Sequence, residues 1–147
     1  MRGLLLLVTL LMVLVSCSEN QSQDTAASLA YAEASIAAQN YEAAQNTCDS
    51  LMQVTTDLYA TQRCHLSIIY MKLADVNISR EEENTAVATR CYNKAFDINK
   101  DSAEIYYSAL SPEEYAHYDM LTKLVNPIRD VTVEEPLDVD ETHLIQE

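Results

Sequence analysis

Glycine is nearly absent from this chain of 147 residues, in which Gly3 is the one glycine. Loops that cradle phosphate groups and tight two-residue β-hairpins both rely on glycine, because other residues do not allow so close an approach or so sharp a turn. The sequence therefore excludes nucleotide-binding loops of that kind. With little glycine, many alanines and 9 tyrosines, the composition favours an all-α protein.

Basic residues are also scarce, since 9 Lys and Arg stand against 23 Asp and Glu, for a formal net charge of −14 at pH 7. Nucleic-acid binding depends on Lys and Arg side chains that replace the counterions of the phosphates. Docking on anionic lipid needs the same cationic side chains. We therefore expect no nucleic-acid partner, and we expect charged partners to be cationic or to be bridged by metal ions.

The N-terminus has the pattern of a secretory signal peptide. One basic residue precedes an almost unbroken apolar run, which is shorter than the roughly 20 residues of a membrane-spanning helix. The run ends at Leu14-Val15-Ser16-Cys17, which resembles the lipobox of bacterial lipoproteins. The resemblance implies that residues 1–16 are a cleaved signal peptide and that Cys17 carries the lipid that anchors the mature chain. The alternative is an ordinary secretory signal with a chance cysteine at its end.

The residues after Cys17 bear on localisation. By resemblance to the sorting rule of enteric bacteria, Ser18 in place of aspartate favours export to the outer membrane. Glu19 and Asp24 are a thin version of the acidic signal that directs lipoproteins to the cell surface in other bacterial groups. We therefore expect a lipid-anchored protein of the cell envelope, at the outer membrane, with its periplasmic and surface faces as open alternatives.

One all-α domain is predicted between two polar segments. Residues 17–24 are expected to form a lipidated tether and residues 126–147, with their many acids, a flexible acidic tail. Between them, over residues 25–125, apolar residues recur at helical spacing. They predict six helices, over residues 25–39, 41–53, 58–76, 81–98, 101–110 and 112–125. Expected buried positions include Tyr59, Val76 and Ile98.

Two of these helices resemble the second helix of a tetratricopeptide repeat, which carries small alanines and then an apolar pair before its exit turn. Ala44 in the first corresponds to Ala88 in the second, 44 positions later. This spacing is longer than the repeat of the family, which is about 34 residues. The Trp and Gly positions of the family are not filled here. The resemblance implies antiparallel helical hairpins stacked into a curved scaffold whose inner helices present a binding surface, and it brings no catalytic residues.

Three cysteines remain besides Cys17, and their spacing leaves alternatives open. In antiparallel predicted helices, Cys64 lies at the same level as Cys48 across one interhelical connection and at the same level as Cys91 across the next. A disulfide of Cys64 with either residue is permitted in an oxidising envelope compartment. The alternative is three buried thiols that pack as small apolar residues. Because no paired ligand motif accompanies these cysteines, we expect neither a metal site nor a cofactor.

Two features relate to carbohydrate. Asp24-Thr25-Ala26 resembles the sites at which some Bacteroidetes attach O-glycans, and Thr25 is the candidate because this segment begins in the predicted tether and is expected to be accessible. Exposed, coplanar tyrosine rings would favour sugar binding, whereas buried rings would favour core packing. The tyrosines in question gather in the last two predicted helices, at Tyr106, Tyr107, Tyr115 and Tyr118.

No cluster of polar residues typical of a catalytic site is recognised, so the sequence predicts that this is not an enzyme. We expect a membrane-anchored helical-repeat adaptor that holds another envelope protein or peptide. The alternative function is a surface lipoprotein that binds glycan or nutrient for an uptake system. An envelope hydrolase, the third class, would need polar side chains that converge in a pocket.

Overall fold

The computed structural model describes residues 23–54 and 57–126 of the chain. Within them the chain forms six α-helices and one short 3₁₀-helix and no strand, so the all-α prediction is confirmed. The predicted signal peptide, Cys17 and the tether up to residue 22 lie outside the described residues. The predicted tail also lies outside them from residue 127 onward.

The first described helix, here called the N-terminal helix, spans residues 23–37, so residues 23 and 24 are helical and do not belong to a tether. Five further helices follow, and the fourth predicted helix has the predicted bounds. They are α2 (Tyr41–Val54), α3 (Ala60–Val76), α4 (Glu81–Ile98), which follows the 3₁₀-helix η1 (Ile78–Arg80), α5 (Lys100–Ser108) and α6 (Pro112–Val125).

The turn between the N-terminal helix and α2 is closed without glycine. Gln39 adopts the left-handed conformation with φ of 61°. The Asn40 N–H donates to the Ser35 carbonyl at 2.8 Å and the Gln39 N–H donates to the Ile36 carbonyl at 2.9 Å, which is a Schellman motif. Because a side chain with a Cβ pays roughly 1–2 kcal/mol in this region, the turn is a strained point.

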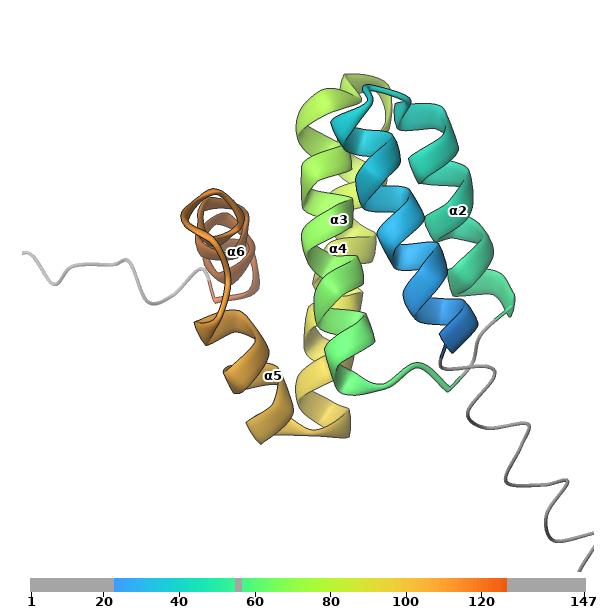
Figure 1. Ribbon diagram of the computed structural model, residues 1–147. Helices are drawn as coiled ribbons and strands as arrows, with labels where there is room; N and C mark the ends of the chain where they lie inside the picture. The colour runs from blue at the N-terminus through green and yellow to red at the C-terminus, as the bar shows by residue number, and fades with distance from the viewer. Residues whose placement is uncertain (1–22, 55–56, 127–147) are drawn as a thin grey trace, which may run out of the picture.

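The N-terminal helix with α2 and α3 with α4 form two helical hairpins that lie side by side, whereas α5 and α6 meet at a steep angle and pack on α3 and α4 (Figure 1). Helix α3 is central, because it contacts α2, α4, α5 and α6. Every residue from Leu66 to Met71 is buried, so α3 is covered on all sides at its middle. In Figure 1 α6 is seen end-on, whereas α3 and α4 run along the page, so α6 crosses this pair.

Several alanines lie in the interior of the domain. Five of them are fully buried, and small side chains at such positions let neighbouring backbones come near each other. Ala44 and Ala88, the matched alanines of the two similar segments, are both in the main apolar cluster of the domain. The five are Ala32, Ala44, Ala88, Ala95 and Ala103.

Three predicted core positions are wrong. Tyr59 is 54% exposed, Val76 42% and Ile98 45%. All three lie at helix ends, where the apolar stripe continues but no other helix covers it; Tyr59 is the N-cap of α3 and not part of that helix. The predicted start of α6 at residue 112 is correct, and Ser111 caps this start in a capping box with Glu114.

Candidate functional site

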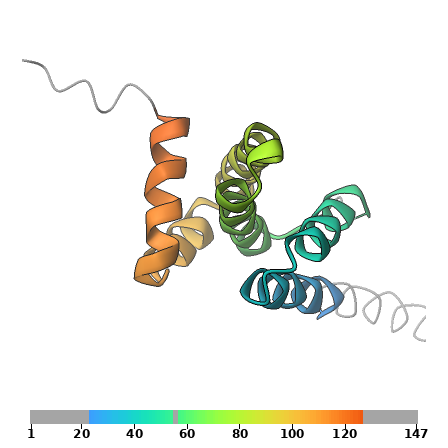
Figure 2. The ribbon, with the colours of Figure 1, turned by 90° about the horizontal axis from the view of Figure 1, so that it is seen from above.

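A groove lies between three helices that are far apart in the sequence. Its floor is α3, and its walls are the N-terminal helix and the first turns of α6, which lie on the same side of α3 when the molecule is seen from above (Figure 2). We call it the α3 groove; its volume is about 380 Å³. Its lining residues are Glu33, Ile36, Ala37, Lys72, Asp75, Val76, Glu113 and His117.

Lys72 ties both walls of the α3 groove to its floor. The Lys72 Nζ lies 3.1 Å from Glu114 Oε1 on α6 and 3.6 Å from Glu33 Oε1 on the N-terminal helix. The Lys72 side chain is 19% exposed, so these ion pairs are partly shielded from water and stronger than surface pairs. This half-buried cation therefore joins both walls of the α3 groove to its floor.

Two histidines make further ties across the α3 groove. His65 Nε2 lies 3.0 Å from Glu33 Oε1, which again joins α3 to the N-terminal helix. His117 Nε2 lies 2.9 Å from Asp75 Oδ2, and its Nδ1 lies 3.2 Å from the carbonyl oxygen of Glu113. The structure thus places His117 in the α3 groove with most of its side chain covered.

The surroundings of Glu114 favour its ionised form. Burial by itself would raise its pKa, but the hydrogen bonds from Ser111 and Lys72 outweigh burial and hold the pKa of Glu114 below its ordinary value. The carboxylate thus serves as helix cap and as partner of Lys72 at once. This double role fixes the start of α6 against α3.

Two kinds of surface in the α3 groove remain uncovered. Val76 is a large apolar residue exposed at its edge, and Ile36 is partly exposed beside it. Glu113 and Asp75 are exposed acids at the α6 side. The α3 groove therefore presents an exposed apolar patch next to exposed carboxylates.

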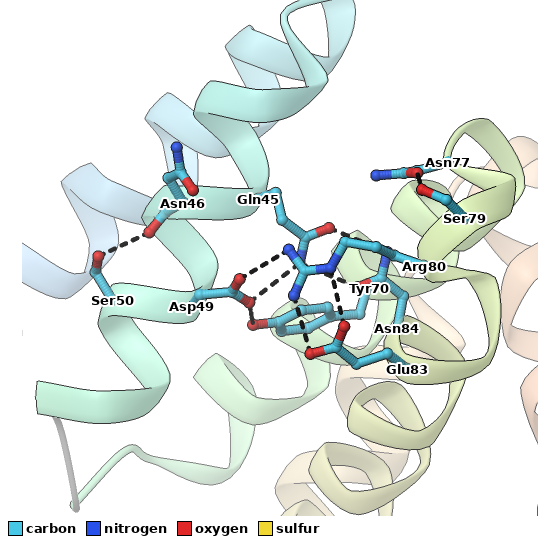
Figure 3. A network of polar contacts seen from close by, with 10 residues as sticks. All are labelled: Gln45, Asn46, Asp49, Ser50, Tyr70, Asn77, Ser79, Arg80, Glu83 and Asn84. Atoms are coloured by element: carbon cyan, nitrogen blue, oxygen red, sulfur yellow. Dashed lines mark hydrogen bonds and ion pairs between the residues drawn. The ribbon is translucent and has the colours of Figure 1, made fainter.

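A second polar site lies on the other side of α3 and is closed (Figure 3). We call it the amide network. Gln45 on α2 and Asn84 on α4 are both buried, and each side-chain amide donates to the other's oxygen at 3.0 Å. The pairing joins residues 39 positions apart and fixes the register of the first hairpin on the second.

Asp49 extends the amide network toward the surface. Its Oδ1 accepts hydrogen bonds from the Tyr70 hydroxyl at 2.8 Å and from Gln45 at 3.0 Å, and its Oδ2 lies 3.1 Å from Arg80. Arg80 also pairs with Glu83, and this contact lowers the pKa of Glu83. Both oxygens of Asp49 are thus occupied within the chain, which indicates a structural role.

The three cysteines of the described region are free, buried thiols. Cys91 Sγ lies 3.8 Å from Met52 Sδ, and Cys64 belongs to a separate apolar cluster under α5. Burial raises the pKa of Cys48 to about 12 and that of Cys64 and Cys91 to about 11. The structure thus has the second predicted arrangement, three thiols packed as apolar residues. At pH 7 they are protonated and weak nucleophiles.

The tyrosines of α5 and α6 are mostly part of the core. Tyr107 is buried, stacks on Tyr118 at 4.5 Å and shares a hydrogen bond of 2.9 Å with Ser67. Tyr115 alone among the four predicted tyrosines exposes more than half of its surface. It borders a hollow of about 340 Å³ between α4 and α6. The rings therefore do not form an exposed coplanar platform.

Thr25 does not lie in an accessible tether. It is part of the N-terminal helix and is 3% exposed. Thr25, Leu29 and Ala32 recur at helical spacing on the buried side of this helix, so the threonine hydroxyl faces the protein. The folded chain thus hides the residue that was predicted as an O-glycosylation site.

No family model matches this chain, and neither a curated protein nor a solved structure matches it significantly. Among the described residues, no helix combines the length and apolar character needed to cross a bilayer, and no three His, Cys, Asp or Glu side chains gather as metal ligands.

Sequence reasoning missed the α3 groove, although one signal was present. Lys72 is the only charged residue between Leu66 and Ala74 in α3, the most apolar of the helices α2 to α6. A lone lysine in such a helix needs a carboxylate partner or a path to water. The sequence does not say that the partners come from residues 33 and 114.

Proposed function

We propose that this protein is a membrane-anchored adaptor of the bacterial cell envelope that holds another envelope protein or peptide in the α3 groove. The observation that carries the proposal is the α3 groove itself, in which an exposed apolar patch at Val76 lies beside exposed acids. The two stacked hairpins support it, because stacked helical hairpins can present their inner helices as a binding surface.

The anchoring part of the proposal rests on the lipobox-like segment that ends at Cys17. A lipid on Cys17 would hold the domain at a membrane without cationic side chains, which suits a chain of net charge −14. The signal after Cys17 favours the outer membrane. Replacing Cys17 with Ser should leave the precursor unprocessed and lose membrane retention; a Cys17→Ser protein that is still cleaved and membrane-bound would contradict the anchor.

A non-catalytic role agrees with the chemistry of the described residues. The buried thiols are protonated, and the carboxylate of Asp49 is engaged by Tyr70, Gln45 and Arg80. An acyl-transfer or hydrolytic site needs a nucleophile held beside a base in a pocket. The contacts found here instead join helices to one another.

The test of the adaptor is a groove-dependent capture from membranes. Cells that express the full lipidated chain would be crosslinked, and the complexes purified and identified. Val76→Arg places a long cation on the edge of the α3 groove, where the 42% exposure of Val76 lets the protein fold. Ile105→Arg is the matched control, because Ile105 is 69% exposed on α5 and lies outside the groove lining.

The adaptor predicts a partner captured by the wild type and by Ile105→Arg but lost from Val76→Arg. Equal capture by all three proteins would remove the α3 groove from the proposal. Capture of no specific partner by the wild type, under conditions that preserve known envelope complexes, would contradict the adaptor itself.

Glycan binding is the second candidate function, and the hollow beside Tyr115 favours it. An exposed ring near Asp119 and Lys123 offers a stacking face with polar groups at its edge. Titration with envelope glycans should then show binding that Tyr115→Ala removes. The buried state of Tyr107 and the tilt of Tyr115 against Tyr118 by 57° favour the adaptor over this function.

A further inference from the structure

We infer that the occupant of the α3 groove is a basic protein segment in which an apolar side chain is flanked by Lys or Arg. The inference rests on the proposed adaptor function and names the chemistry of the partner. The apolar side chain would cover Val76 and Ile36, and a flanking cation would pair with Asp75 and Glu113.

The charges of the α3 groove favour a cation. Four carboxylates lie in or at the α3 groove, whereas its one lysine, Lys72, is already paired with Glu33 and Glu114. The excess negative charge is therefore borne by the other two, Asp75 and Glu113, at the α6 side, where an incoming cation meets attraction and an incoming anion meets repulsion.

Asp75 and Glu113 both contact His117, one by its side chain and the other by its main chain. His117 Nε2 lies 2.9 Å from Asp75 Oδ2, and its Nδ1 lies 3.2 Å from the backbone carbonyl oxygen of Glu113. Asp75 is 52% exposed and precedes Val76 directly in α3. A guanidinium or ammonium group placed here would contact a carboxylate next to the apolar patch, which matches a segment with neighbouring basic and apolar residues.

Anionic ligands are disfavoured at the same place for a separate reason. The start of α6 has unpaired backbone N–H groups that would attract an anion. Ser111 and Glu114 already cap this end, and Glu113 adds a second negative charge to its first turn. The site that would hold a phosphate or a substrate carboxylate is thus occupied by the chain's own acids.

The experiment uses the full lipidated chain in a neutral detergent and three short labelled peptides with blocked ends. One carries leucine between arginines, the second leucine between glutamates, and the third alanine between arginines. Binding would be followed by fluorescence anisotropy, with detergent alone as the blank. We expect the arginine–leucine peptide to bind more tightly than either of the others.

Asp75→Asn with Glu113→Gln removes the two exposed acids of the α3 groove, and Asp97→Asn with Glu82→Gln removes two exposed acids of α4. The two double variants have the same net charge, so they separate a local site from general attraction to an acidic protein. The first should weaken binding of the arginine–leucine peptide about fivefold, as the loss of two partly exposed ion pairs implies. The second should leave the affinity unchanged.

Equal weakening by both double variants, or equal binding of the glutamate–leucine peptide, would overturn the inference. So would absence of binding by the arginine–leucine peptide. Those outcomes leave the adaptor intact if Val76→Arg still abolishes capture from membranes, because the partner would then bind the same groove by other chemistry. Loss of groove-dependent capture would instead remove the adaptor, whatever the peptides do.

Discussion

Helix α3 separates two polar regions that are built from similar residues and behave differently. On the side of α2 and α4, the amide network joins Gln45, Asp49 and Asn84 by contacts that stay inside the protein. On the side of the N-terminal helix and α6, the α3 groove leaves Asp75 and Val76 at the surface. Polar side chains that satisfy each other stabilise an interface, whereas polar side chains left beside an apolar patch offer one.

Mutations in the two regions should have different consequences. Disturbing the amide network should cost stability, because a buried amide that loses its partner pays its full desolvation cost. Disturbing the exposed acids of the α3 groove should cost binding and little stability, because water replaces the lost contact. Mutations and pH can test this division.

Alkaline pH should have the largest effect on the free energy of unfolding, and it should act through the buried thiols of α2 and α4. Burial raises the pKa of Cys48 from its ordinary 9.0 to about 12 and that of Cys91 to about 11. The folded state therefore keeps the thiols protonated while the unfolded state ionises them. The stabilisation is complete below pH 9 and is lost as the pH rises through the folded pKa values, at about 1.4 kcal/mol per thiol for each pH unit.

Urea unfolding at pH 7 and pH 10.5 measures this loss. The Cys48→Ala, Cys91→Ala double variant serves as the control, since it should be less stable at pH 7 but fall less between the two pH values. A wild-type free energy of unfolding that is equal at both pH values would contradict the buried, neutral state of these thiols.

Asn84→Ala should have the next largest effect. It removes both hydrogen bonds to Gln45 and leaves the Gln45 oxygen buried without them, so we expect a loss of about 2–4 kcal/mol in the free energy of unfolding. Chemical denaturation checks it. Replacing Gln45 and Asn84 together with Leu should recover part of the loss, and a single Asn84→Ala variant within about 0.5 kcal/mol of wild type would show that the amide network contributes little.

Lys72→Met should have an intermediate effect, because Lys72 joins both walls of the α3 groove to its floor. The change leaves Glu33 and Glu114 without their shared cation, and we expect a loss of about 1–2 kcal/mol. Thermal unfolding measures it, with Lys94→Met, at an exposed position of α4, as the control. Equal stability of the two variants would mean that Lys72 does not hold the walls of the α3 groove.

Glu114 should have the smallest effect, and it should be visible in acid. Because its folded pKa lies below the ordinary value of 4.5, its contribution is present above that value and is lost as the pH falls through the folded pKa. Glu114→Gln should therefore lower stability at pH 7 by about 0.5–1 kcal/mol and converge with wild type in strong acid. A difference that is constant from pH 7 to pH 3 would contradict the ion pair.

Local signals in the sequence placed several elements well. Helix α4 begins with glutamates in its first turn, and α6 begins with Ser111 as its cap and Pro112 as its first residue. Each of these signals lies within one helical turn, so a short stretch of sequence is enough to indicate where the helix starts. The fully buried Ala44 and Ala88 followed from their place in matching helices. Helix existence and most helix ends were thus predictable.

The sites were not predictable, because they depend on which helices become neighbours. Gln45 and Asn84 look like surface residues in any helical pattern, and their burial follows only from the parallel placement of α2 and α4. Thr25 looked accessible because the N-terminal helix extends further back than its apolar residues indicate. The α3 groove combines residues 33, 72 and 113, which no local pattern relates.

The most direct test of the central claim is site-specific photo-crosslinking in living cells. A photoreactive amino acid would replace Val76 in the α3 groove and, in a second strain, Ile105 on α5. We expect a discrete crosslinked partner from position 76 and none from position 105. A partner trapped from position 105 but not from position 76 would contradict the α3 groove as the binding surface.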